Sequence, residues 1–106
     1  MGSHAPLADL MIISPNRRSF LIDVKGLYRV NPWLVKRKPP RDDLYYGLAY
    51  VPPEASNRFF IITQAQANAF IEDELSRLGR SDNYPVTGFG WRLAEPYENA
   101  WHLLPK

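Results

Sequence analysis

The chain has no cysteine and no long apolar run. The first absence excludes disulfide bonds and thiolate metal sites. Because no stretch of 18 apolar residues occurs and no signal-peptide pattern opens the sequence, we expect neither a membrane span nor secretion, and we predict a cytoplasmic protein. The sequence also lacks internal repeats, a glycine-rich phosphate loop, the HExxH spacing of zinc proteases and a Ser-His-Asp order. Several familiar classes of enzyme are thereby excluded.

The composition is that of one globular domain. The 106 residues are 45% hydrophobic and 13% aromatic, which is enough for one modest core. Residues 1–4, Met-Gly-Ser-His, look like the remnant of an expression tag. We expect an α/β core over residues 5–80. Residues 81–106 are interrupted by glycine and proline, and we expect an irregular aromatic tail there that packs on the core or on a partner chain.

A β-hairpin is predicted near the start of the chain. Two apolar runs, Leu10–Ile13 and Phe20–Ile22, flank the turn-forming residues Ser14-Pro15-Asn16-Arg17-Arg18. If the loop is centred on Asn16, opposed residues have numbers that sum to 32. A four-residue loop is the alternative, and it would shift the pairing by one residue and place Asp9 opposite Val24 instead of Asp23.

The hairpin centred on Asn16 brings two carboxylates together. Asp9 then lies opposite Asp23, and opposed side chains on one face have Cβ atoms about 4.5–5.5 Å apart. Because side chains alternate along a strand, Lys25 lies on the same face as Asp23. Carboxylate oxygens are ligands for hard cations such as Mg²⁺, which activate water and neutralise phosphate charge. The alternative is that Asp9, Asp23 and Lys25 are ordinary charged residues on a solvated strand face.

At these residues the sequence resembles the PD-(D/E)xK nuclease superfamily, which has the restriction-endonuclease-like fold. The family pattern is an acid at the start of one strand and an acid-x-Lys on the next, here Asp9 and Asp23-Val24-Lys25. The likeness extends loosely over residues 5–78. It implies that Asp9 and Asp23 are metal ligands, that the Val24 carbonyl completes the metal shell, and that Lys25 is the catalytic lysine. The implied cofactor is Mg²⁺ or Mn²⁺.

The sequence departs from the family pattern ahead of Asp9. Pro6 stands three residues before Asp9 instead of next to it, and the helix that usually precedes the first strand is missing. With two carboxylates instead of three, we expect weak metal affinity and slow cleavage that favours Mn²⁺. The sheet face that such a helix would cover should expose apolar side chains, so we also expect a homodimer.

Positive charge is concentrated in one segment. Residues 16–41 carry eight of the thirteen basic residues against one acid, a net charge of +7, whereas the rest of the chain carries −5. This segment predicts a basic face that binds a polyanion such as DNA, although a charge run of this kind also serves solubility. The candidate nucleic-acid-binding residues are Arg17, Arg18, Lys36, Arg37, Lys38 and Arg41.

Further elements complete the expected fold. Strands are predicted at residues 33–36, 44–51 and 58–62, the second of them interior and covered on both faces because it has hardly any polar position. A capping box, Thr63 with Gln66, predicts that a helix starts there, and Gly79 is a plausible stop. We therefore predict an α/β fold with a mixed five-stranded sheet and one main helix that covers a face.

Two functions follow from these patterns. The first is a Mg²⁺-dependent endonuclease, a phosphodiester hydrolase that grips DNA with its basic residues and has Asp9, Asp23 and Lys25 at its active site. The second is a non-catalytic domain of the same fold that binds nucleic acid or a protein partner. Metal binding at the two acids separates them, because a binding domain has no need of it.

Overall fold

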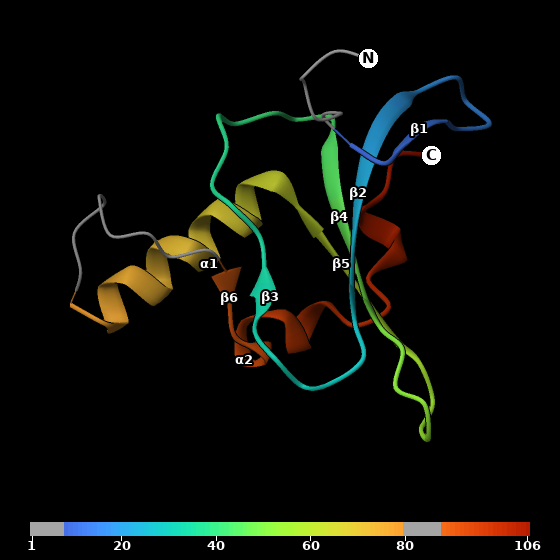
Figure 1. Cartoon of the computed structure of the whole chain (residues 1–106). Coiled ribbons are helices and arrows are strands. Elements are labelled where there is room, and N and C mark those ends of the chain that lie inside the picture. The colour runs from blue at the N-terminus through green and yellow to red at the C-terminus, as the bar shows by residue number, and fades with distance from the viewer. Residues whose placement is uncertain (1–7, 80–87) are drawn as a thin grey trace, which may run out of the picture.

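A mixed four-stranded sheet is the centre of the molecule (Figure 1). The computed structural model describes residues 8–79 and 88–106; the proposed tag remnant at residues 1–4, Pro6 and residues 81–87 lie outside these ranges. The strand order is β1 (Leu10–Ile13), β2 (Ser19–Leu27), β4 (Leu44–Tyr50) and β5 (Arg58–Thr63). The central pair, β2 and β4, is parallel, and the two outer pairs are antiparallel. The predicted α/β class with a mixed sheet is confirmed.

The expectation of five strands in one sheet is wrong. The strand expected at residues 33–36 is β3 (Trp33–Leu34), and it pairs with β6 (Gly88–Phe89) in a separate two-stranded sheet. The two backbones approach closely at Gly88, where an added Cβ would lie 1.9 Å from the Trp33 carbonyl oxygen. β6 follows the helix in the chain, so no local pattern around Trp33 indicates this pairing.

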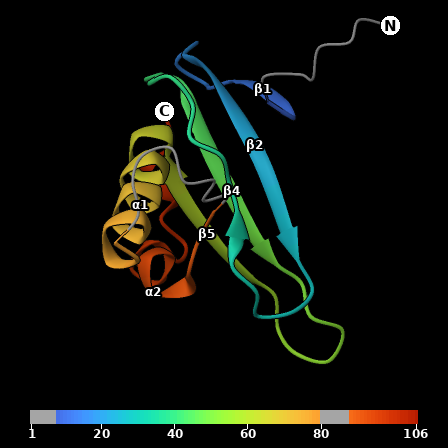
Figure 2. The same ribbon diagram turned by 60° about the vertical axis from the view of Figure 1, so that its left-hand side comes forward.

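The main helix, α1 (Gln64–Arg77), covers one face of the sheet, as expected (Figure 2). Its N-cap is Thr63, whose hydroxyl accepts from the Gln66 N–H while the Gln66 side chain accepts from the Thr63 N–H. The helix ends at Leu78, and Gly79 has a φ of +66°, the left-handed conformation that glycine adopts freely. No helix in the described ranges is long and apolar enough to cross a membrane.

The core lies between the sheet and α1. Alternate residues of β4 face the helix and are fully buried, but those on the opposite face are only partly buried, so the expectation of a strand covered on both faces holds for one face. The two neighbouring strands and α1 contribute further apolar side chains to this cluster. Its main members are Leu44, Tyr46, Leu48, Phe60, Ile62, Ala67 and Ile71.

The tail from Gly88 onward is more regular than expected. It forms β6, α2 (Trp91–Ala94) and two short 3-10 helices, η1 (Glu95–Tyr97) and η2 (Trp101–Leu103). The Trp91 ring stacks on the buried Trp33 ring at 5.3 Å, so this segment belongs to the core. Trp101 lies against Phe59 and remains half exposed. Trp91 of this segment thus packs on the core, whereas Trp101 stays at the surface.

Candidate metal and phosphate site

The hairpin holds the register that the loop centred on Asn16 predicts. Leu10 pairs with Ile22 and Ile12 with Phe20, which excludes the register shifted by one residue. Ser14 closes the turn, because its N–H donates to the Arg18 carbonyl at 2.9 Å and its hydroxyl accepts from the Arg18 N–H at 3.1 Å. The left-handed residue of the turn is Arg17, with a φ of +62°, and not Asn16.

This register brings Asp9 to the edge of β2. One carboxylate oxygen of Asp9, Oδ2, accepts a hydrogen bond from the Val24 N–H at 2.8 Å. That bond holds the pKa of Asp9 below its ordinary value, with smaller contributions from the polar contact with the Asp23 side chain and from the charges of Lys25 and Lys38. Asp9 is therefore a carboxylate at neutral pH, and it lies next to Asp23 as the sequence predicts.

Asp23 sits at the margin of the core and is only 8% exposed. Its Cα partner on β4 is the buried Tyr46, so its side chain points to the helix-bearing face. The Asp23 Oδ2 lies 3.2 Å from the Lys25 Nζ and 3.7 Å from the Lys38 Nζ. The interpretation of Asp23 as an ordinary solvated residue is therefore wrong. We call Asp9, Asp23, Lys25 and Lys38 the acid–lysine cluster.

The position of Lys38 in this cluster was not expected from the sequence, which indicated only a phosphate-binding surface residue. Helix α1 fixes it: the Lys38 carbonyl accepts from the Asn68 Nδ2 at 2.8 Å and from the Gln64 Nε2 at 3.2 Å. The Lys38 N–H in turn donates to the Asn68 Oδ1 at 3.2 Å. Gln64 is fully buried. No sequence pattern marks these two amides as supports of the cluster.

Tyr46 lies beneath the cluster. The Lys38 Nζ stands 5.6 Å from the centre of the Tyr46 ring, and the ring hydroxyl is buried without a hydrogen-bond partner among the described residues. Burial, with a smaller contribution from the Asp23 charge, raises the pKa of Tyr46 to about 12. The hydroxyl is therefore protonated at neutral pH.

The oxygen donors of the cluster suit a hard divalent cation. The Val24 N–H points to Asp9, and because the N–H and C=O of one residue in an extended strand point to the same side, the Val24 carbonyl lies on that edge too. The pairing of β1 with β2 ends at Leu10 and Ile22, just before this position. Two carboxylates and one carbonyl are ligands of the type that Mg²⁺ and Mn²⁺ take. Within residues 8–79 and 88–106, no group of three or more acidic, histidine or cysteine side chains could hold a metal.

The expected basic residues fall into two groups. Arg17 and Arg18 lie on the exposed hairpin turn and Lys36 lies exposed after β3, and none of the three has an ion-pair partner among the described residues. In contrast, Arg41 makes a double hydrogen bond to Asp43, at 2.8 and 2.9 Å, and Arg37 lies 3.8 Å from Glu72. The carboxylate of Asp43 raises the pKa of Arg41. Arg37 and Arg41 are therefore partly neutralised within the chain.

Comparisons with family models, with curated proteins and with solved structures give no match for this chain. The proposed function therefore rests on the geometry of the acid–lysine cluster.

Proposed function

We propose that this protein is a divalent-metal-dependent nuclease that hydrolyses phosphodiester bonds in DNA. Asp9 and Asp23 are the metal ligands in this proposal, with the Val24 carbonyl as a third oxygen donor, and Lys25 is the catalytic lysine. We also propose that the chain is a member of the PD-(D/E)xK nuclease superfamily, which it resembles at these residues. The observation that carries it is the convergence of two carboxylates and Lys25 at the edge of β2.

The local geometry supports these roles. Asp9 reaches the site from the chain before β1, whereas Asp23 and Lys25 come from one face of β2. The donors are thus held by two different segments of the hairpin, whose register fixes their separation. Asp23 and Lys25, which lie on a strand, are held more firmly than side chains on loops, and the hydrogen bond to the Val24 N–H holds Asp9.

The chemistry assigned to each residue follows from its charge. When bound, a divalent cation supplies a Lewis acid and lowers the pKa of a coordinated water. The Asp9 and Asp23 carboxylates hold that charge in place. The Lys25 ammonium, 3.2 Å from Asp23, is close enough to the ligand set to donate a hydrogen bond to a phosphate oxygen and stabilise its developing negative charge. Lys38 adds a second positive charge beside it.

DNA is the proposed partner because three exposed cations have no acidic partner in the described part of the chain. Arg17, Arg18 and Lys36 are exposed and available to phosphates. A second copy of the chain is also proposed as a partner, through the exposed apolar side chains of β1.

A non-catalytic nucleic-acid-binding domain is the second candidate. Lys25 and Lys38 both pair with Asp23, so the two carboxylates and two ammonium groups of the cluster balance without a metal. A structural ion-pair cluster of this kind would tie the segment after β3 to the sheet.

Cleavage assays with Mn²⁺ and DNA test the nuclease. The native protein should cut slowly, and Lys25→Ala should lose at least about a hundredfold in rate, the scale of one lost transition-state hydrogen bond, while it still binds DNA. Lys106→Ala is the matched control, because Lys106 is an exposed lysine outside both the cluster and the candidate DNA-binding residues, and it should cut at close to the native rate. Equal cleavage by the native protein and Lys25→Ala would overturn the catalytic role of Lys25. No cleavage by native protein that binds DNA would favour the binding domain.

A further inference from the structure

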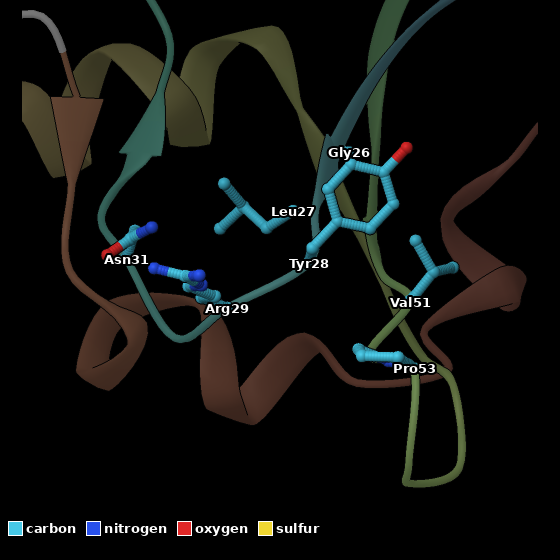
Figure 3. A pocket seen from close by; sticks show the side chains of 7 residues that line it. All are labelled: Gly26, Leu27, Tyr28, Arg29, Asn31, Val51 and Pro53. Atoms are coloured by element: carbon cyan, nitrogen blue, oxygen red, sulfur yellow. The ribbon is translucent and has the colours of Figure 1, made fainter.

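A second feature lies beyond the acid–lysine cluster, at the ends of the two parallel strands. An open hollow of about 680 Å³ lies where β2 and β4 end (Figure 3). The chain after β2 supplies Tyr28, Arg29 and Asn31, and the chain after β4 supplies Val51 and Pro53. The Val51 N–H donates to the Leu27 carbonyl at 2.8 Å, which holds the two walls together.

The polar side chains of this hollow have no partner within the described chain. Tyr28 is 74% exposed. Within residues 8–79 and 88–106, the side chains of Tyr28, Arg29 and Asn31 make no hydrogen bond, ion pair or ring contact, although the backbone carbonyl of Asn31 accepts from the Trp91 Nε1–H at 2.8 Å. An exposed aromatic ring, a guanidinium and a carboxamide therefore surround one hollow. These groups can stack on a planar ring, bind an anion and read a polar edge.

We propose that this hollow, which we call the Tyr28 hollow, binds one unpaired nucleotide of a DNA strand. The base stacks on the Tyr28 ring, the phosphate pairs with Arg29 and the base edge contacts the Asn31 amide. This inference rests on the proposed nuclease function, because it names the form of DNA that the site takes. The charge of the Arg29 guanidinium favours a nucleotide over an uncharged aromatic ligand.

The position of the hollow allows one strand of DNA to reach both the hollow and the acid–lysine cluster. Tyr28 follows Asp23 by five residues along β2 and its continuation, which places it about 16 Å away. A smaller hollow of about 300 Å³ lies between these points, lined by Lys25 and Trp33 among others, and it shares Gly26 and Leu27 with the larger one. At about 3.4 Å of rise per nucleotide in a stacked strand, the bound base lies up to about five nucleotides from the cleaved bond.

The stacking requirement selects single-stranded DNA. In a duplex both faces of an internal base are covered by its neighbours, so the base has to leave the stack before an aromatic side chain can cover a face. An unpaired strand offers its bases without that cost. We therefore expect binding to single strands, or to the single-stranded end of a duplex, in preference to a blunt duplex.

Binding measured in EDTA tests this inference without cleavage. Fluorescence anisotropy should be recorded with a labelled single strand and with a blunt duplex of the same sequence. The native protein should prefer the single strand, and Tyr28→Ala should lose about fivefold to 150-fold in single-strand affinity, the cost of one stacked base. Tyr28→Phe keeps the ring and should keep the preference. Neither change should alter the melting temperature, because Tyr28 is exposed.

A pair of arginine variants gives the matched control. Arg29→Ala should weaken single-strand binding more than duplex binding. Arg18→Ala, which removes an exposed arginine from the hairpin turn, should weaken both by a similar factor. The inference would be overturned if Tyr28→Ala lost affinity equally for both forms of DNA or lost none. It would also be overturned if the native protein did not bind single strands.

The outcomes separate this inference from the nuclease proposal. A single-strand preference that depends on Tyr28, in a protein that cuts no DNA with Mn²⁺, would overturn the nuclease and support the Tyr28 hollow. Cleavage by a protein whose preference for single strands does not depend on Tyr28 would overturn the nucleotide site in the Tyr28 hollow and would leave the nuclease proposal standing.

Discussion

Tyr46 is one of two described residues, with Trp33, that have a buried side-chain polar atom without a hydrogen-bond partner. Its hydroxyl is fully buried and has no hydrogen-bond partner among the described residues. Because an unpaired buried hydroxyl costs about 1–3 kcal/mol, Tyr46→Phe should leave the free energy of unfolding unchanged or raise it by up to about 2 kcal/mol. Urea denaturation measures this change. Tyr45→Phe, on the neighbouring and partly exposed residue, is the control and should have little effect. A loss of more than about 1 kcal/mol in Tyr46→Phe would show that the hydroxyl is bonded after all.

Glu98 makes the stability of the protein sensitive to acid. The Arg58 side chain donates to both Glu98 carboxylate oxygens, at 2.9 and 2.8 Å, and holds the pKa of Glu98 below its usual value. The unfolded chain therefore binds a proton at a higher pH than the folded protein does. The stabilisation is present above the usual pKa of a glutamate and is lost as the pH falls through the lower folded value.

Glu98→Gln should remove this part of the acid sensitivity. Urea midpoints measured from about pH 6 down to about pH 3 should fall less steeply in the variant than in the native protein. Glu54→Gln is the control, because Glu54 lies exposed in the loop between β4 and β5 and has no ion-pair partner in the described part of the chain. Parallel curves for Glu98→Gln and native protein would contradict the argument.

Residue positions could be predicted from the sequence where pairing rules fix them. The spacing around Asn16 gave the partners of the β1–β2 hairpin, and with them the approach of Asp9 to Asp23. Lys38 could not be placed in the same way. Its reach to Asp23 depends on the path of the chain after β3, which Gln64 and Asn68 on α1 determine. Contacts between distant segments have no local sequence pattern.

At the scale of elements, β3 and β6 depend on one glycine. A Cβ at Gly88 would lie 1.9 Å from the Trp33 carbonyl oxygen, a backbone atom that a rotamer change cannot move away. Gly88→Ala should therefore lower the free energy of unfolding by about 1–3 kcal/mol, as thermal or urea denaturation measures. Gly90→Ala is the matched control, since nothing lies within 4 Å of its added Cβ. Equal stability of the two variants would mean that the two strands do not approach as described.

The elements that the sequence predicted are those with local signals. Helix α1 has its capping box and an apolar face, and β4 has a continuous apolar run, so both were predicted close to their observed bounds. The small sheet was missed because each of its strands has only two residues and the partners lie on either side of α1 in the chain. Periodicity cannot be read over two residues.

At the scale of the whole molecule, β1 is an apolar edge strand. It has β2 on one side and no strand on the other within the described residues. Met11 is 74% exposed and Ile13 69%. On the face of the sheet opposite α1, an apolar hollow of about 200 Å³ is lined by residues that include Leu10, Val24 and Trp101. Exposed apolar edges of this kind are surfaces that a second chain can cover.

Sedimentation equilibrium should therefore show a homodimer. Met11→Lys places a charge on the β1 edge and should shift the equilibrium toward the monomer without changing the fold, because Met11 is exposed. Leu34→Lys is the control, since Leu34 is an exposed apolar residue outside β1. A native protein that sediments as a clean monomer would contradict the dimer, and dissociation in Leu34→Lys alone would place its interface elsewhere.

Metal binding at Asp9 and Asp23 is the central claim, and isothermal titration with Mn²⁺ tests it most directly. The native protein should bind one ion per chain weakly, since only two carboxylates contribute, and Asp23→Asn should lose the binding heat. Mn²⁺ should also raise the melting temperature of the native protein but not of Asp23→Asn, each measured against its own metal-free value. No binding heat in the native protein, or equal heat in both proteins, would contradict the account.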